Sequence, residues 1–305
     1  MFADAAAALG GDSPRRRKKN HSKLRGGAVG AVVATPFDHQ NCSDLRAADA
    51  VRARRAYVKS RADDDVAYVY LGDMEQDGEG GSASFDDFAS QFYPAVRARG
   101  MIIDVRRNAG GNIDTWILER LLRAAWLFNA ERSGPPDVTM QYAFSGEVVV
   151  LVDERTSSDA EIFALAARRL GVGTVIGQRT WGGAVGYSGD AELALVDGSA
   201  FTIPSFGPYD ADGAWAIEQR GVVPDVVVAN APVATSRGGD AQLDAAIEVL
   251  NKKLAEAPAK GKVPIKPTYP NRSFDAKTCE AGGDGSAKEE GGGGEDAKAA
   301  KAVGA

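Results

Sequence analysis

Apolar residues recur along the middle of this chain in two alternating patterns. Short aliphatic and β-branched runs, typical of buried strands, occupy residues 66–71, 100–105, 148–152, 174–176 and 222–228. Between them lie longer segments of helix-forming residues, or of apolar residues three or four apart, at 45–60, 85–99, 115–129, 158–167 and 241–254. Strands that alternate with helices predict an α/β domain, a layered sheet with flanking helices.

Two further strand signals fall outside this alternation. Residues 191–196 and 199–203 flank Asp197-Gly198, a dipeptide that signals a hairpin. Residues 29–35 (VGAVVAT) form another apolar run, for which the neighbouring sequence offers no obvious partner strand.

The composition divides the chain into a folded core and two polar ends. Residues 1–27 are rich in Ala and Gly and then strongly basic, whereas 258–305 are rich in Pro, Lys, Gly and Glu. We expect both ends to be disordered tails, because neither has enough apolar residues to form a core. The basic run also fits a localisation signal or a nucleic-acid arm. Between the tails we expect a short strand and linker at 28–44 and the folded core at 45–257.

Overall composition narrows the classes of function. The chain has 305 residues, 44% of them hydrophobic, and a net charge of −6, which argues against a general nucleic-acid binder. Its two cysteines, Cys42 and Cys279, indicate a reducing compartment without disulfides or a zinc site. No apolar run is long enough to span a membrane, and the first residues do not follow the order of a secretory signal. We therefore expect a cytoplasmic protein that has no cofactor and binds neither membrane nor metal.

The segment 147–167 (EVVVLVDERTSSDAEIFALAA) combines a strand, a polar turn and a helix with a hydroxyl at its first turn. Ser158-Asp159-Ala160-Glu161 fits the S-x-x-E capping box, a structural device that satisfies free N–H groups. The alternative interpretation makes Ser158 a nucleophile, because N–H groups at a helix N-terminus stabilise a developing oxyanion. The segment alone favours the cap and leaves both interpretations open.

A second strand-to-helix turn precedes this one and contains Gly110-Gly111. In a parallel sheet such turns gather at the carboxyl edges of the strands, where sites form. The glycine pair is explained structurally by a tight turn with positive φ. Functionally, it would expose a backbone N–H close to the Ser158 hydroxyl. Two such amides usually form an oxyanion hole, here those of Gly111 and Asp159.

Several ordered motifs together resemble one family. The chain carries, in order, IIDVRRNAGGN, LVDERTSSDAEIFA, GVGTVIGQRTWGGAVG and AWAIEQRGVVPDVVV, followed by GGDAQLDAAIEVL. This order resembles the C-terminal protease core of the tricorn branch of the tail-specific serine peptidases, over about residues 28–270. The resemblance implies a ClpP/crotonase-like α/β fold and hydrolysis of peptide bonds in peptides or unfolded polypeptide segments. It is also compatible with a homo-oligomer.

The resemblance assigns a role to each matching position. It implies that Ser158 is the nucleophile and that the amides of Gly111 and Asp159 form the oxyanion hole. Glu218, in AIEQRG, corresponds to the glutamate that helps to organise a catalytic histidine. Substrate-binding positions fall on Gly110, within the glycine cluster, and on Asn129. We expect Asn129 late in the helix after that cluster, where the family carries an acidic residue that selects basic substrates.

The position of the general base separates two mechanisms. Relatives with a Ser–Lys dyad carry lysine where this chain has Gly183, so the resemblance implies the histidine mechanism. The family's histidine lies in a helical domain followed by a PDZ domain, whose last strand resembles Val29–Thr35. The chain has only His21 and His39, both before the core, and we expect neither to act as the base.

The isolated chain is therefore expected to be weakly active or inactive, as the nucleophile half of a peptidase. A shortened gene model, a degenerate paralogue and one part of a split enzyme would each explain the missing histidine. Two other functions remain open. One is a non-catalytic peptide-binding or assembly module that uses the inherited cleft, and the other is a crotonase-like acyl-CoA enzyme.

Overall fold

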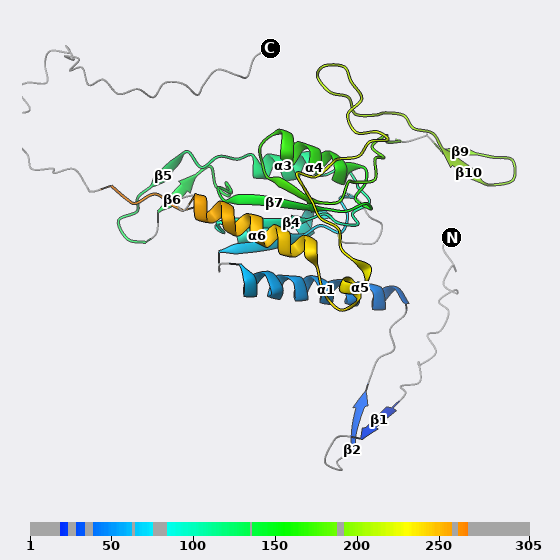
Figure 1. The fold of residues 1–305 in the computed structure, drawn as a ribbon, viewed down its shortest axis with the longest axis horizontal. Coiled ribbons are helices and arrows are strands. Elements are labelled where there is room, and N and C mark those ends of the chain that lie inside the picture. The colour runs from blue at the N-terminus through cyan, green and yellow to red at the C-terminus, as the bar shows by residue number, and fades with distance from the viewer. Residues whose placement is uncertain are drawn as a thin grey trace, which may run out of the picture. The chain divides into compact units, whose positions relative to one another are not determined.

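The fold is built on a five-stranded parallel sheet in the order β11-β8-β7-β4-β3 (Figure 1). The strands are β3 (Val66–Tyr70), β4 (Gly100–Asp104), β7 (Glu147–Val152), β8 (Thr174–Gly177) and β11 (Val226–Val227). Neighbouring strands are all parallel, and Gly100 of β4 lies opposite Glu147 of β7. β4 is buried along its whole length, as its continuous apolar run predicted. The predicted α/β class is confirmed.

A computed structural model describes residues 19–23, 29–33, 39–62, 65–75, 84–134, 136–187, 192–257 and 262–267. The tails expected at 1–27 and 258–305 lie outside the described residues, apart from 19–23 and 262–267. The chain divides into two units, Met1–Pro264 and Ile265–Ala305, and all the helices and strands belong to the first.

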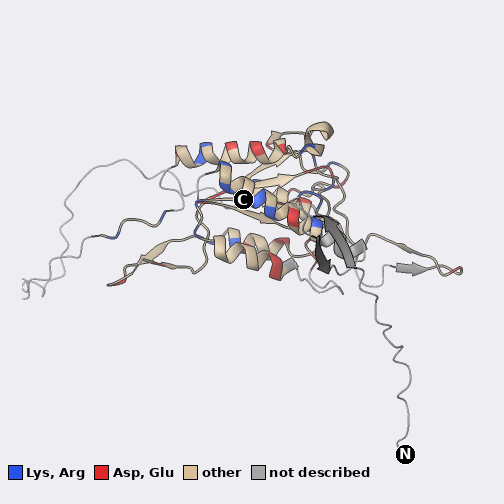
Figure 2. Ribbon diagram, turned by 90° about the horizontal axis from the view of Figure 1, so that it is seen from below, with Lys and Arg blue, Asp and Glu red and all other residues tan. Residues whose placement is uncertain are grey.

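Helices cover both faces of the sheet. The helices of the described chain are α1 (His39–Arg61), α2 (Ser84–Ala95), α3 (Asp114–Leu121), α4 (Asp159–Arg169), α5 (Pro232–Ser236), which has no buried residue, and α6 (Ala241–Glu256). Figure 1 shows α3 and α4 on one side of the sheet and α1 and α6 on the other. The basic and acidic residues of the helices drawn in Figure 2 are interspersed.

Two apolar cores result from the alternation of side chains along each strand. Ile103 and Val150 point toward α2, α3 and α4, where they pack with residues such as Phe88, Phe92 and Phe163. Their sequence neighbours Ile102 and Val149 point the other way and pack with residues of α1 and α6, such as Val58, Leu243 and Leu250. Burial on both faces explains why these strands lack a polar side.

Three two-stranded hairpins accompany the sheet. β9 (Glu192–Ala194) and β10 (Ala200–Thr202) pair around Asp197-Gly198, as predicted. β2 (Val29–Val33) pairs with β1 (Lys19–Lys23), so the expectation that this strand has no partner is wrong. The sequence KNHSK has no alternation of apolar residues and lies in the segment expected to be a tail.

The third hairpin corrects the predicted helix at 115–129. α3 ends at Leu121, and the following chain forms β5 (Leu127–Asn129) paired with β6 (Asp137–Thr139). The helical spacing continues to Trp126, but that side chain is 67% exposed and Leu122 is 49% exposed, whereas Leu121 is buried. The core therefore does not extend past the second turn of α3, and no packing energy favours a longer helix.

Two smaller differences concern the end of the core. The strand expected at 222–228 shrinks to Val226–Val227, because Pro224 has no N–H to donate to a ladder. The short helix α5 was not predicted. Within the part of the chain that the structure describes, no helix has both the length and the apolar character that a membrane span requires.

Candidate active site

The two strand-to-helix turns singled out by the sequence lie side by side. β4 and β7 are neighbours in the sheet, so the turns that follow them leave its carboxyl edge together. Several hydrogen bonds join the turns, among them Ser157 N–H to the Asn108 carbonyl (3.0 Å), Val105 N–H to the Leu151 carbonyl (3.0 Å) and the Thr156 hydroxyl to the Val105 carbonyl (3.0 Å). The relative position of the two turns is therefore fixed by backbone contacts.

Ser158 adopts a backbone conformation that is rare for a residue with a side chain. Its φ is 54° and its ψ is −126°, the geometry that a type II′ turn normally assigns to glycine. Such a conformation costs about 1–3 kcal/mol and persists only where the surroundings enforce it. It also places the hydroxyl at the very start of α4. Strain at a residue that carries a nucleophilic side chain supports a functional interpretation.

The glycine pair is explained by close approach. A Cβ at Gly110 (φ 105°) would lie 2.5 Å from the Ser158 Cβ and 2.9 Å from the Asp159 nitrogen. A Cβ at Gly111 (φ 149°) would lie 1.9 Å from the carbonyl carbon and oxygen of Met74. Both positions therefore require glycine, for space as well as for backbone conformation. The approach of Gly110 brings the peptide bond that it shares with Gly111 against the serine turn.

Two backbone N–H groups at this point lack protein acceptors. Among the residues that the structure describes, neither the Gly111 N–H nor the Asp159 N–H donates a hydrogen bond. Asp159 is the first residue of α4, where helix geometry leaves the N–H without a partner. Both amides belong to the two turns that meet at Ser158, where Gly110 lies against Ser158 and Asp159. Groups of this kind can stabilise a developing negative charge on oxygen.

The Asp159 side chain has a separate role. Its carboxylate accepts hydrogen bonds from the N–H groups of Ile113 (2.9 Å) and Asp114 (3.0 Å), at the start of α3. Burial, together with the nearby Asp114 carboxylate, raises the pKa of Asp159 to about 7. This contact ties the first turn of α4 to the first turn of α3.

Glu161 has more partners than a capping box requires. It is fully buried, and Ser158 N–H donates to it at 3.2 Å, as the S-x-x-E pattern predicted. It also accepts hydrogen bonds from the segment 180–183, which follows β8. The sequence pointed only to the local contact, since most of these additional donors are backbone N–H groups that any residue carries.

Glu218 lies on the far side of the same segment. Its Oε2 accepts hydrogen bonds from the N–H groups of Ala184 (2.8 Å) and Val185 (2.9 Å), and the residue is half-buried. Gly183, the residue before Ala184, accepts a hydrogen bond from Ser158 N–H at 2.9 Å. Glu218 is therefore connected to the serine turn through a single short loop.

One predicted residue is not brought to this turn. Asn129 is exposed and lies on β5 instead of late in a helix, where its amide donates to the Thr139 hydroxyl at 3.3 Å. No contact within the described part of the chain joins Asn129 to Ser158. His21 lies in β1 and His39 is the first residue of α1, and both side chains are outside those that the structure describes.

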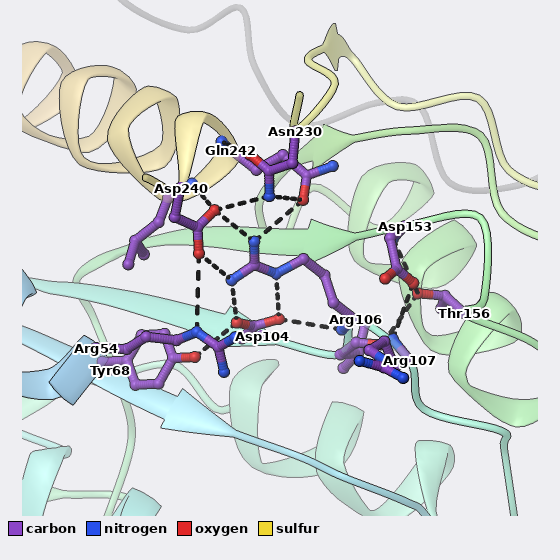
Figure 3. Close-up of polar contacts among 12 residues, drawn as sticks. Arg54, Tyr68, Asp104, Arg106, Arg107, Asp153, Thr156, Asn230, Asp240 and Gln242 are labelled. Atoms are coloured by element: carbon purple, nitrogen blue, oxygen red, sulfur yellow. Dashed lines mark hydrogen bonds and ion pairs between the residues drawn. The ribbon is translucent and has the colours of Figure 1, made fainter. Parts of the chain in front are cut away.

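A second polar cluster lies at the same sheet edge, on the side of α1 and α6 (Figure 3). Arg106 is its centre and donates from all five side-chain N–H groups, to Asp104 (2.9 and 2.7 Å), Asp240 (2.7 and 2.9 Å) and Gln242 (3.1 Å). Although burial opposes it, the Asp104 carboxylate raises the pKa of Arg106, which therefore stays charged. Because Asp104 ends β4 and Asp240 precedes α6, Arg106 joins the start of α6 to the end of β4.

Comparison with known proteins identifies the family. The model of peptidase family S41 matches residues 65–228, which is more than half of the chain. This chain therefore belongs to peptidase family S41. The five strands of the sheet, helices α2, α3 and α4, and the Ser158 and Gly111 turns lie within the matched segment, whereas α1, α5 and α6 lie outside it.

Similar proteins come from the tricorn branch of the family. Tricorn protease homolog 1 of Streptomyces coelicolor is 34% identical over 235 residues, 77% of this chain and 21% of that protein. Tricorn protease of Thermoplasma acidophilum is 32% identical over 204 residues, 67% of this chain and 18% of that protein. The crystal structure of the tricorn protease matches with a TM-score of 0.69 at 29% identity, covering 78% of this chain and 22% of that one. The chain thus spans about a fifth of the length of these relatives.

Proposed function

We propose that this chain carries the catalytic core of a serine peptidase, with Ser158 as the nucleophile. The observation that carries the proposal is the strained Ser158, enforced beside two backbone N–H groups that have no acceptor among the described residues. A sharp, strained turn that presents a serine at the start of a helix is also the arrangement of hydrolase nucleophile elbows. Membership of family S41 supports the same chemistry.

The reaction follows from the positions of these groups. The Ser158 Oγ attacks the carbonyl carbon of a peptide, and its proton passes to a general base. The carbonyl oxygen becomes an oxyanion, which the N–H groups of Gly111 and Asp159 stabilise. The C–N bond then breaks, the base returns the proton to the leaving amine, and an ester links the substrate to Ser158. Water hydrolyses this ester through a second oxyanion at the same amides.

The base is the part of the machinery that the described side chains do not supply. Gly183 stands where a lysine dyad would need its amine, so we propose an imidazole base, as in the tricorn branch. Glu218 is proposed to organise the side of the site where that imidazole binds. Its Oε2 is held by Ala184 and Val185, while its Oε1 accepts no hydrogen bond from the described residues. We expect the isolated chain to hydrolyse peptides slowly, because the oxyanion hole without a base retains only a residual rate.

The proposed substrates are peptides and unfolded polypeptide segments. Gly110 leaves the approach to Ser158 open, because any side chain there would collide with the serine. A homo-oligomer remains a prediction from the resemblance, and a cytoplasmic location remains a prediction from the composition.

The test compares the purified chain with Ser158→Ala on unstructured fluorogenic peptides. We expect slow hydrolysis and slow labelling of the hydroxyl by a fluorophosphonate, both abolished in the variant. Turnover that survives the substitution would remove Ser158 from the mechanism.

A second candidate is a non-catalytic peptide-binding module. Large exposed aromatic side chains between 181 and 215 favour it, among them Trp181 (65% exposed), Tyr209 (71%) and Trp215 (65%). This alternative predicts that Ser158→Ala leaves peptide affinity unchanged and that the chain never reacts with a fluorophosphonate.

A further inference from the structure

Glu161 is a buried carboxylate whose contacts exceed those of a helix cap. It accepts four hydrogen bonds: from Ser158 N–H (3.2 Å), Gly183 N–H (2.9 Å), Gly182 N–H (2.8 Å) and the Thr180 hydroxyl. An ionised carboxylate has about four acceptor positions, so its capacity is filled. Three of the donors lie 19 to 22 residues further along the chain. The carboxylate therefore joins two loops as well as closing one turn.

All the partners of Glu161 are donors. The Thr180 hydroxyl is itself oriented, because it accepts a hydrogen bond from Val222 N–H at 2.7 Å and so directs its proton to Glu161. A neutral carboxylic acid or an amide at this position would carry its own donor toward these groups. One or more hydrogen bonds would then be lost and a buried donor left unsatisfied. The site is thus built for an anion.

These contacts form a closed ring with the serine. Ser158 N–H lies between Glu161 Oε2 (3.2 Å) and the carbonyl of Gly183 (2.9 Å), and the Gly183 N–H donates to the same Oε2. The peptide bond before Ser158 cannot rotate without breaking both of its contacts. The φ and ψ values of Ser158 also set the direction of the Asp159 N–H, since that N–H belongs to the next peptide bond. The ring consequently fixes both the nucleophile and one oxyanion donor.

We propose that Glu161 is a positioning residue that holds Ser158 in its strained conformation by locking the segment 180–183 onto the serine turn. The inference rests on the proposed function for its catalytic meaning. The structural part, a carboxylate that maintains the strain, can be tested without any turnover. Glu161 does not touch the reacting atoms, and it acts through Ser158 and Gly183.

The experiment compares hydrogen exchange in the full chain and in Glu161→Gln, which preserves shape and removes the charge. We expect backbone N–H groups of 156–159 and 180–184 to lose protection by about 10-fold or more, the loss expected from breaking hydrogen bonds to a charged group. The matched control is Leu250→Ala, which opens a fully buried position on the opposite face of the sheet. It should lower protection throughout the domain without singling out these two segments.

A milder pair of variants covers the case in which Glu161→Gln fails to fold. Thr180→Val removes the hydroxyl donor at nearly constant volume, whereas Thr180→Ser keeps it. We expect exchange in 180–184 to rise in the valine variant and to stay near wild type in the serine variant. Equal protection in all variants, or a loss that Leu250→Ala reproduces at equal global stability, would overturn the proposal. A wild-type chain that neither cleaves peptides nor reacts with fluorophosphonate would contradict the proposed function, yet leave this comparison intact.

Discussion

Replacing Arg106 by methionine should destabilise the domain by about 3–5 kcal/mol, the cost of leaving a buried partner unpaired. The Arg106 side chain is 8% exposed and supplies two hydrogen bonds each to Asp104 and Asp240. Methionine has a similar length but no donor. Asp104, which is fully buried, would keep only the Tyr68 hydroxyl (2.6 Å) and one backbone N–H. The start of α6 would also lose its tie to β4.

Urea unfolding followed by far-UV circular dichroism measures this loss directly. For a folded domain of this size it corresponds to a fall in melting temperature of about 10 °C. The control is Arg52→Met, which removes an ion pair with Asp49 whose side chains are 76% and 64% exposed. That variant should change stability by about 0.5 kcal/mol or less. A loss below about 1 kcal/mol for Arg106→Met would refute the argument, because that is the range of an ordinary surface change.

The double variant Asp104→Asn with Arg106→Met checks the physical origin of the effect. Each single variant leaves the other charge of the pair buried, whereas the double variant removes both. The summed losses of the single variants should therefore exceed the loss in the double variant, by about 0.5–3 kcal/mol. Simple additivity would show that the two residues stabilise the fold independently.

Three further perturbations have defined outcomes. Gly111→Ala should prevent native folding, as judged by circular dichroism, because the new Cβ would lie 1.9 Å from the Met74 backbone. The control, Gly171→Ala, also has a positive φ but has open space around it, and should lower the free energy of unfolding by only about 1 kcal/mol. Ser158→Gly should raise stability by about 1 kcal/mol in urea unfolding, because glycine adopts the strained conformation freely, while abolishing fluorophosphonate labelling. The raised pKa of Asp159 means that the folded state binds its proton more tightly than the unfolded state, so its contribution to stability falls as pH rises from 3.8 to about 7. The melting temperature of Asp159→Asn should lack this decline relative to wild type between pH 4 and pH 8, and parallel pH profiles would contradict the assignment.

The sheet could be predicted from the sequence because its strands are buried on both faces. Apolar runs such as 100–103 and 148–152 have the length of strands and are too short for typical helices, and they alternate with helical segments along the chain. The helix at 115–129 was overestimated for the opposite reason. Helical spacing persists to Trp126, but the core that would stabilise a longer helix ends at Leu121. Only the tertiary structure shows where a core ends.

The convergence of the site could be predicted for a topological reason. Turns that follow parallel strands gather at the carboxyl edge of a sheet, so the turns that contain Gly111 and Ser158 could be expected to lie near one another. The strain at Ser158 could not be foreseen, since serine is compatible with an ordinary cap and the sequence shows no sign of φ 54°. The predicted position of Asn129 was wrong because it depended on a helix that ends at Leu121.

The carboxylates around the serine turn show why the other contacts of the site could not be predicted from the sequence. Asp159, Glu161 and Glu218 each accept hydrogen bonds from two or more backbone N–H groups of a different loop or turn. Backbone donors carry no residue identity, so such contacts leave no pattern in the sequence beyond an acidic residue. Yet a strained serine keeps its conformation only where the neighbouring residues hold it in place. Short loops have few apolar contacts that could do so. Carboxylates that accept several N–H hydrogen bonds supply contacts that apolar packing would otherwise provide, and the sequence shows each of them only as an acidic residue.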